Sequence, residues 1–169
     1  MSRYYFRVFA DYFKFELQNE GAEPLVDLWN EKTLAERFAV GDGVVWISAA
    51  RNMDVPVLVE IQNVVGDEPF TEDTLRTWDH VVECSIDISS GCLVIWGTGE
   101  YYPDAPRVKL TPGTYQVRAY FGGLSTLSEN GLTGDDVYVI TLRSGSPIQP
   151  RVIKQYTGRE RIEISSDGG

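Results

Sequence analysis

Apolar and polar residues alternate along most of this chain, in short runs bounded by Gly, Pro, Asn or Asp. Successive side chains of a β-strand point to opposite faces, so such runs indicate half-buried strands. The pattern predicts an all-β fold, an antiparallel β-sandwich of about nine or ten strands with one short helix; a closed barrel is the alternative. The clearest runs are 4–9, 12–17, 44–50, 56–62, 81–88, 92–96, 108–110, 114–121 and 137–142.

The strongest turn signal is Pro112-Gly113, which separates 108–110 from 114–121. Proline presets one turn residue and glycine supplies a positive φ, so the two runs are predicted to form a hairpin. If Thr111 pairs with Thr114, one face carries six apolar residues and needs a second sheet to cover it. These residues are Val108, Leu110, Tyr115, Val117, Ala119 and Phe121.

A further strand pair and a short helix are also predicted. Runs 44–50 and 56–62 are joined by a connection too short for a crossover, so we expect them to pair antiparallel. Between 30 and 40, Leu34 and Phe38 fall at helical spacing, which predicts a short helix that ends at Gly41. Asn30 and Thr33 are both good candidates for its N-cap.

The regular pattern weakens after Leu142. Residues 144–150 are rich in Gly, Ser and Pro, and alternation returns only partly in 152–164. We therefore expect a β-sandwich domain over 1–145 and a C-terminal extension over 146–169. The extension is either an extra edge strand or a mobile arm, with residues 165–169 disordered. A turn of helix is also expected near 71–75.

Charge narrows the classes of partner. The chain has 169 residues and a net charge of −10; residues 1–142 carry 10 Lys and Arg against 22 Asp and Glu, which is −12, and residues 143–169 carry 5 against 3. Such an acidic body disfavours direct nucleic-acid binding and could steer a basic protein partner. The alternative is that acidity only maintains solubility. No window approaches the roughly 20 apolar residues that span a membrane. The first ten residues lack a signal-peptide pattern, so a cytoplasmic location is expected.

The two cysteines are expected to be free thiols. Cys84 and Cys92 lie in runs joined by Ser90-Gly91, which suits a two-residue hairpin turn. In that register Cys84 lies on the face of Ile86 and Ile88, and Cys92 lies on the opposite face, so a disulfide cannot form. With a three-residue loop, Cys84 and Cys92 would instead lie on the same face.

The sequence offers little for catalysis. His80 is the single histidine, which excludes any site that needs two imidazoles. It precedes Cys84 by four residues, or roughly 13 Å along a strand, too far for a proton transfer between them. Motifs for a nucleophilic serine, a phosphate loop or paired zinc cysteines are missing. We therefore expect a protein that is not an enzyme and that needs no cofactor.

One loop suggests a protein interface. Glu100, Tyr101, Tyr102 and Asp104 set two aromatic rings among carboxylates, and tyrosine is enriched at the centres of interfaces. The alternative is a plain turn whose tyrosines cover the edge of the core.

Two other groups are weaker candidates. Asp135 and Asp136 form a second acidic site, which could contact a partner or, with Asp104 or Asp42, hold calcium; adjacent aspartates are more often solvated turn formers. Trp46 and Trp96 lie opposite the faces predicted to be inward and could help to form a sugar-stacking platform. Buried aromatic packing is the commoner role.

Several segments occur in a characteristic order: 11–15, 26–29, the helical segment, 39–45 with Gly41-Asp42-Gly43, 50–52, 57–61, 110–117 and 136–142. In this order they resemble the competence protein J family, which includes a bacterial inhibitor of the DNA-entry nuclease. The matching segments cover about the first 145 residues discontinuously; 64–80 and the tail after Ser144 have no counterpart in the family.

This resemblance implies a small acidic protein that binds a nuclease and blocks it without chemistry of its own. A nuclease cleft is basic because it receives phosphates, so carboxylates on a rigid scaffold could occupy it. The residues inferred to contact the partner are Glu100, Tyr101, Tyr102, Asp104, Asp135 and Asp136. The alternative functions are a small ligand-binding β-sandwich, for carbohydrate or calcium, and an interaction module of another kind.

Overall fold

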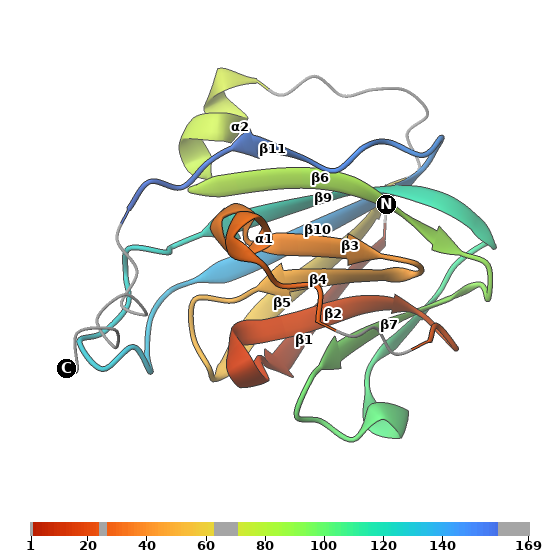
Figure 1. Cartoon of the computed structure of the whole chain (residues 1–169), viewed down its shortest axis with the longest axis horizontal. Coiled ribbons are helices and arrows are strands. Elements are labelled where there is room, and N and C mark those ends of the chain that lie inside the picture. The colour runs from red at the N-terminus through yellow and green to blue at the C-terminus, as the bar shows by residue number, and fades with distance from the viewer. Residues whose placement is uncertain (1, 24–26, 63–70, 159–169) are drawn as a thin grey trace.

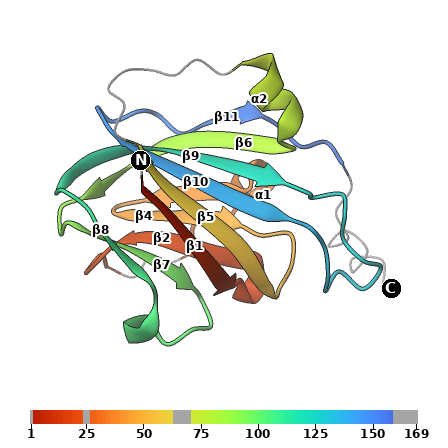
Figure 2. The ribbon, with the colours of Figure 1, turned by 180° about the vertical axis from the view of Figure 1, so that it is seen from behind.

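The computed structural model, which describes residues 2–23, 27–62 and 71–158, contains two β-sheets. The six-stranded sheet has, in spatial order, β1 (Ser2–Phe9), β5 (Asp54–Gln62), β10 (Val137–Ser144), β9 (Gly113–Gly122), β6 (His80–Ile88) and β11 (Arg151–Lys154). The five-stranded sheet has β3 (Phe38–Gly41), β4 (Val44–Ser48), β2 (Lys14–Asn19), β7 (Cys92–Gly97) and β8 (Arg107–Lys109). Figures 1 and 2 show the two sheets from opposite sides.

Four short helical segments lie between the strands that the structure describes. Two are α-helices, α1 (Glu31–Glu36) and α2 (Glu72–Thr77), and two are 3-10 helices, η1 (Asp11–Phe13) and η2 (Tyr102–Asp104). The prediction of a mostly β chain is confirmed. The sequence pattern predicted one helix and about nine or ten strands, whereas the described residues contain two α-helices and 11 strands.

The buried faces of the two sheets share one hydrophobic core. Phe15 and Leu17 of β2 belong to the same cluster as Val117 and Phe121 of β9. The ring of Tyr138 on β10 meets Phe15 edge-on, with the ring centroids 5.8 Å apart. The apolar face predicted from alternation is confirmed, because five of its members are buried and Leu110 packs against the cluster.

The predicted hairpin at Pro112-Gly113 is wrong. β8 pairs with β7 in the five-stranded sheet, and β9 pairs with β6 and β10 in the six-stranded sheet. The chain therefore crosses from one sheet to the other at this turn. Alternation cannot distinguish these arrangements, because residues that face a shared core show the same period in either case.

Two other predicted pairs fail for the same reason. β4 lies in the five-stranded sheet, whereas β5 lies in the six-stranded sheet, where it pairs antiparallel with β1 and parallel with β10. The six-stranded sheet is therefore mixed rather than antiparallel. β6 and β7 likewise belong to different sheets, so the register used for the cysteines is wrong. The prediction of free thiols is nevertheless confirmed for Cys84 and Cys92.

The first helix is shorter than its pattern suggested. Asn30 caps it: its side chain accepts a hydrogen bond from the Thr33 amide at 2.9 Å, and the Thr33 hydroxyl accepts one from the Asn30 amide. Arg37 then takes a left-handed conformation with φ 66°, and the chain continues as strand β3. Leu34 is consequently 56 % exposed while Phe38 is buried in β3, so their helical spacing was misleading.

The C-terminal extension contributes an edge strand. β11 pairs antiparallel with β6, and the Arg151 guanidinium binds the Glu83 carboxylate. The Lys154 ammonium donates to the carbonyl oxygen of Trp78 at 2.7 Å. Of the two alternatives for the extension, the structure shows the strand for residues 151–154. The turn of helix expected near 71–75 is confirmed as α2, capped by Thr71; the expectation of disorder at 165–169 lies outside the described residues.

Candidate functional site

The predicted interface loop follows β7 and folds as the 3-10 helix η2. β7 can approach the end of β1 because residue 97 is glycine: a Cβ there would lie 2.2 Å from the Phe9 carbonyl oxygen. Glu100 ties the loop to the same strand, since its Oε1 accepts a hydrogen bond from the Phe9 amide at 2.8 Å. Its backbone carbonyl accepts another from the Trp96 indole N–H at 2.9 Å. Glu100 therefore anchors the loop through one carboxylate oxygen and its backbone carbonyl.

Tyr101 and Asp104 are the polar side chains of η2 and its N-cap that project outward, beside the exposed Pro103. Tyr101 is 72 % exposed, and Asp104 is also exposed. Tyr102 turns back and meets Trp96 edge-on, at 5.5 Å between ring centroids. The loop thus has an outward pair, Tyr101 and Asp104, and an inward ring, Tyr102.

Arg107 at the start of β8 organises this loop. Its guanidinium donates to the carbonyl oxygens of Ala105 at 2.7 Å and Pro103 at 3.1 Å, and it lies over the Tyr102 ring. It also pairs with the Glu20 carboxylate at 2.7 Å. The side-chain hydrogen bond from Arg107 lowers the pKa of Glu20, so that carboxylate stays charged. Arg107 therefore connects η2 to the loop that follows β2.

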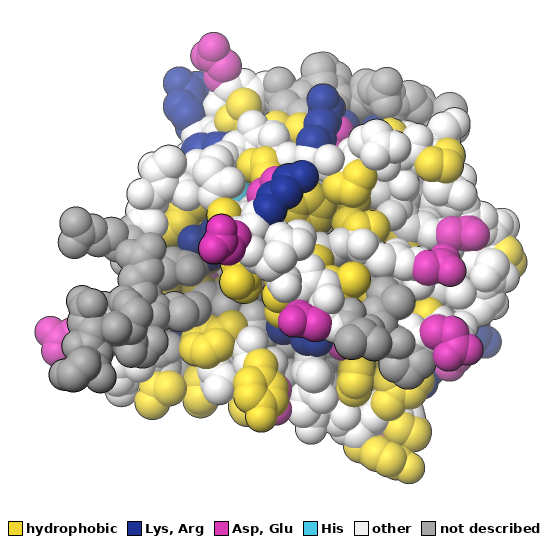
Figure 3. Space-filling view, viewed as in Figure 1, with side chains coloured by type: hydrophobic (Ala, Val, Ile, Leu, Met, Phe, Trp, Pro, Cys, Tyr) yellow, Lys and Arg dark blue, Asp and Glu magenta, His cyan; other side chains and the backbone are white. Residues whose placement is uncertain are grey.

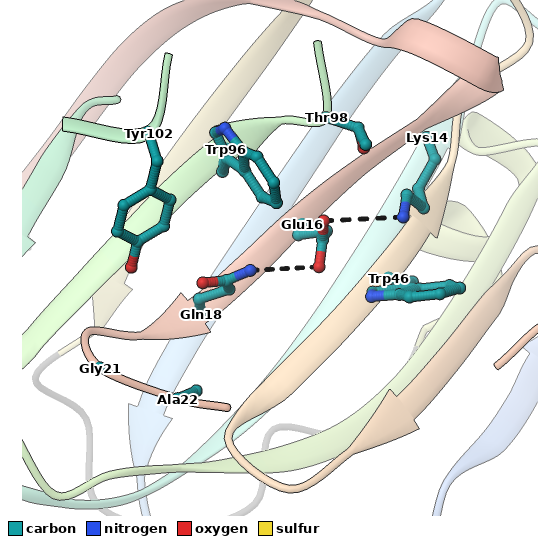
Figure 4. Close-up of a pocket in the computed structure, with 9 residues that line it drawn as sticks. All are labelled: Lys14, Glu16, Gln18, Gly21, Ala22, Trp46, Trp96, Thr98 and Tyr102. Atoms are coloured by element: carbon teal, nitrogen blue, oxygen red, sulfur yellow. Dashed lines mark hydrogen bonds and ion pairs between the residues drawn. The ribbon is translucent and has the colours of Figure 1, made fainter. Parts of the chain in front are cut away.

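Next to η2, a groove of about 450 Å³ opens on the five-stranded sheet, on the side away from the shared core. Its floor is a cross-strand row, because Glu16 on β2 is paired with Trp46 on β4 and with Trp96 on β7. Figure 4 shows the two indoles on either side of Glu16 and Gln18. Tyr102 and Thr98 form one wall, and Gly21 and Ala22 lie along another.

The polar groups of the groove form one network. The Lys14 ammonium lies 3.6 Å from a Glu16 carboxylate oxygen and 3.6 Å from the centroid of the Trp46 ring. The Gln18 amide donates to the other oxygen of Glu16 at 3.2 Å. Although Glu16 and Gln18 point away from the core, both are buried, because the neighbouring rings and loops enclose them.

Two polar atoms that line the groove are left without a partner among the described residues. Trp46 Nε1 and Thr98 Oγ1 are both buried, and neither makes a hydrogen bond. The whole Trp46 side chain is 94 % buried, since the residue is 6 % exposed. A buried donor or hydroxyl without a partner costs about 1–3 kcal/mol, so native structures contain few of them.

Asp135 and Asp136, the second predicted acidic site, have separate roles. Asp135 is exposed, in the connection between β9 and β10. Asp136 is 1 % exposed and lies 2.6 Å from Arg51 Nε. Its other oxygen accepts a hydrogen bond from the Tyr138 hydroxyl at 2.8 Å, and that hydroxyl accepts one from the Ala50 amide. Asp136 is therefore an interior residue and cannot contact a partner.

The two predicted acidic sites do not form one surface. In Figures 1 and 2 the connection between β9 and β10 lies far from η2. Among the residues that the structure describes, no three His, Cys, Asp or Glu side chains are grouped so that they could hold a metal ion. No helix in the described ranges is long and apolar enough to cross a membrane.

His80 and Cys84 are interior residues of β6. His80 Nδ1 accepts a hydrogen bond from the Tyr156 amide at 3.0 Å, so Nε2 carries the proton and donates to the Glu36 carbonyl oxygen at 2.7 Å. Burial lowers the pKa of His80 to about 4 and raises the pKa of the Cys84 thiol to about 12. A neutral, fully hydrogen-bonded imidazole and a protonated thiol make no nucleophilic pair.

The groove was not predicted from the sequence, although the orientation of some of its residues was. The opposite orientation of Trp46 and Trp96 was visible from alternation, as was the polar face of β2. The pairing of β2 with both β4 and β7 was not, and only that pairing brings the two indoles to either side of Glu16.

Comparisons with known proteins identify a fold but no family. A scan against protein-family models and a search of curated protein sequences both find no match. The structure is similar to the crystal structure of ComJ from Bacillus subtilis, an inhibitor of the DNA-degrading activity of NucA, with a TM-score of 0.60 and 16 % identity, covering 86 % of this chain and 96 % of ComJ. It is also similar to the protein described as crocagin biosynthetic gene J, with a TM-score of 0.51, 14 % identity and coverage of 86 % and 97 %. At these identities the chain shares a ComJ-like fold.

Proposed function

We propose that this protein is a non-catalytic inhibitor that binds a nuclease. The observation that carries the proposal is the structural likeness to ComJ, which extends over 96 % of that inhibitor. The partner is then a protein with a phosphate-binding, basic cleft. A fold likeness alone does not transfer a partner, so the surface of this chain must supply a reason of its own.

The surface around η2 supplies that reason. Exposed carboxylates come from three neighbouring segments, and we call Glu20, Glu23, Asp42 and Asp104 the acidic rim. The β3–β4 turn adjoins the loop after β2, since the Asn19 amide donates to the Gly43 carbonyl oxygen at 2.8 Å. Arg107 joins Glu20 to η2. Figure 3 shows acidic side chains on this face, with several near the edge where the β3–β4 turn lies in Figure 1.

In this proposal Tyr101 is the anchor and the acidic rim guides the approach. A tyrosine that is 72 % exposed is well placed to enter a cleft, and tyrosines are enriched among residues that dominate binding energy. The surrounding carboxylates complement a basic cleft and accelerate association. Tyr102 and Glu100 support the loop from below, and Asp136 takes no part.

The direct test mixes the purified protein with a nuclease of the kind that ComJ inhibits, taken from the same genome. We expect DNA cleavage to stop at excess protein, and the two chains to elute together from a sizing column. Undiminished cleavage together with separate elution would reject the proposal.

A further inference from the structure

The groove beside η2 has features that binding to a nuclease does not use. Its charges are balanced internally, because Lys14 and Glu16 pair at 3.6 Å and their side chains are only 12 % and 6 % exposed. A cation would meet the Lys14 ammonium above the Trp46 ring, and an anion would meet the Glu16 carboxylate. The floor of the groove therefore favours a ligand without net charge.

Hydrogen-bonding capacity is concentrated in the same space. Glu16 offers carboxylate oxygens, Gln18 offers an amide, and Tyr102 brings a hydroxyl to the wall. Trp46 Nε1 and Thr98 Oγ1 add a donor and a hydroxyl that no described residue satisfies. In Figure 4 the nitrogen-bearing edge of Trp46 points toward Gln18 and Ala22, that is, into the groove. A ligand rich in hydroxyl groups would complete these bonds.

Trp96 supplies the apolar part of the site. Its indole N–H is occupied by the Glu100 carbonyl oxygen, so the ring itself is what it offers to a ligand. Trp46 cannot stack in the same way, since Lys14 covers its ring and Trp29 packs against it at 5.5 Å between centroids. The groove thus combines an aromatic surface, from Trp96 and Tyr102, with a strip of planar polar side chains.

From this arrangement we propose that the groove binds a neutral sugar, as a monosaccharide or a disaccharide. A pyranose ring presents C–H groups on its faces, which pack on an aromatic ring, and hydroxyl groups at its edge, which bond to carboxylates and amides. The volume of about 450 Å³ lies within the usual range for small-ligand sites. This inference does not depend on the nuclease proposal, and either can fail alone.

The test is saturation-transfer NMR of the full chain with uncharged methyl glycosides of glucose, galactose, mannose and N-acetylglucosamine and with their disaccharides. Titration calorimetry then gives the affinity of any binder. We expect at least one sugar to bind with a dissociation constant near or below about 1 mM. Absence of saturation transfer from every sugar at about tenfold that concentration overturns the proposal. Tighter binding of free arginine or acetate than of any sugar overturns the assignment of a neutral ligand.

Variants locate the binding. Trp96→Ala is expected to weaken it by at least about tenfold, while Trp96→Phe keeps an aromatic surface and stays within a few-fold of the wild type. Tyr5→Ala is the control, because Tyr5 is an exposed aromatic residue on β1 of the other sheet. Unchanged affinity in Trp96→Ala contradicts the proposal.

Thr98→Val, a nearly isosteric substitution, gives a second readout. It removes the unpaired hydroxyl, so it should leave the urea midpoint unchanged or raised and yet reduce sugar affinity several-fold. Should Trp96→Ala fail to fold, this variant decides the matter: an unchanged sugar affinity in Thr98→Val then counts against the site.

Discussion

Asp135 and Asp136 show how much the environment of a single residue decides. They are neighbours in the sequence and chemically identical, yet one is exposed and the other is buried against Arg51 and Tyr138. The sequence pattern gave both the same role. The difference arises because Asp136 immediately precedes β10 and lies on the same face as Tyr138, which is buried in the core. Alternation marks that face only weakly, because the run 137–142 is apolar on both faces except at Thr141.

We predict that Asp136→Asn destabilises the protein by about 3–5 kcal/mol, because it leaves the buried Arg51 guanidinium without its countercharge. Asp135→Asn is the matched control and should change the free energy of unfolding by less than about 0.5 kcal/mol. Urea denaturation of both variants measures this. Equal stability of the two would contradict a structural role for Asp136.

His80 predicts a pH dependence of stability. Burial lowers its pKa in the folded state to about 4, below the ordinary 6.5, so the unfolded chain binds the proton more readily between these values. The contribution of the neutral His80 side chain to the free energy of unfolding is complete above pH 6.5 and is lost progressively as pH falls toward 4. We expect a loss of about 2 kcal/mol between about pH 7 and pH 5.

The control for this prediction is His80→Gln, whose amide can still donate and accept hydrogen bonds but does not titrate. Denaturation curves at several pH values give the free energy of unfolding of both proteins. Across this window it should depend more steeply on pH in the wild type than in His80→Gln. The same slope in both would show that another group is responsible.

At the scale of elements, η2 is the unit on which the proposed interface depends. Its outward residues are exposed, while Glu100, Tyr102 and Arg107 fix its backbone. A loop held in this way loses little conformational entropy on binding. Because the outward side chains take no part in the contacts that fix the loop, they can be changed without disturbing the fold.

We predict that Tyr101→Ala combined with Asp104→Asn weakens nuclease binding at least about tenfold and leaves the urea midpoint unchanged. Glu129→Gln, an exposed charge change in the connection between β9 and β10, which lies far from η2, should leave binding within about twofold. Affinities from calorimetry decide the matter. Full affinity in the double variant would place the interface elsewhere.

Alternation in the sequence was enough to predict which residues face the core but not which strands pair. Tyr115, Val117 and Phe121 are buried as their period implied, whereas β8 and β9 lie in different sheets. Short connections served as evidence for hairpins, although the same lengths also carry the chain from one sheet to the facing one. The loop proposed as an interface could be singled out from composition, whereas the groove could not, since it depends on pairings distant in the sequence.

For the whole molecule, the uneven charge is expected to affect the rate at which a basic partner associates. Residues 1–142 carry −12, and part of that charge lies in the acidic rim. Exposed charges act over roughly 10 Å at 0.1 M salt, so they speed encounters more than they hold a complex together.

We predict that the association rate with a nuclease falls at least about tenfold between about 0.01 and 0.3 M salt, while the dissociation rate changes little. Stopped-flow fluorescence gives both rates. Neutralising Glu23 and Asp42 together, as Glu23→Gln and Asp42→Asn, should flatten this dependence. A rate that does not respond to salt would mean that the rim does not face the partner.

In the proposed function, the protein blocks a nuclease by occupying it and not by chemistry. The most direct measurement is residual DNA cleavage as the protein is titrated into a fixed amount of nuclease. We predict that DNA cleavage falls linearly and stops at a fixed molar ratio of protein to nuclease. After the two proteins are separated, the nuclease should regain full activity and have an unchanged mass. Loss of activity at far less than that ratio, growing with time, would indicate a catalytic effect, and cleavage that persists at any excess would contradict inhibition altogether.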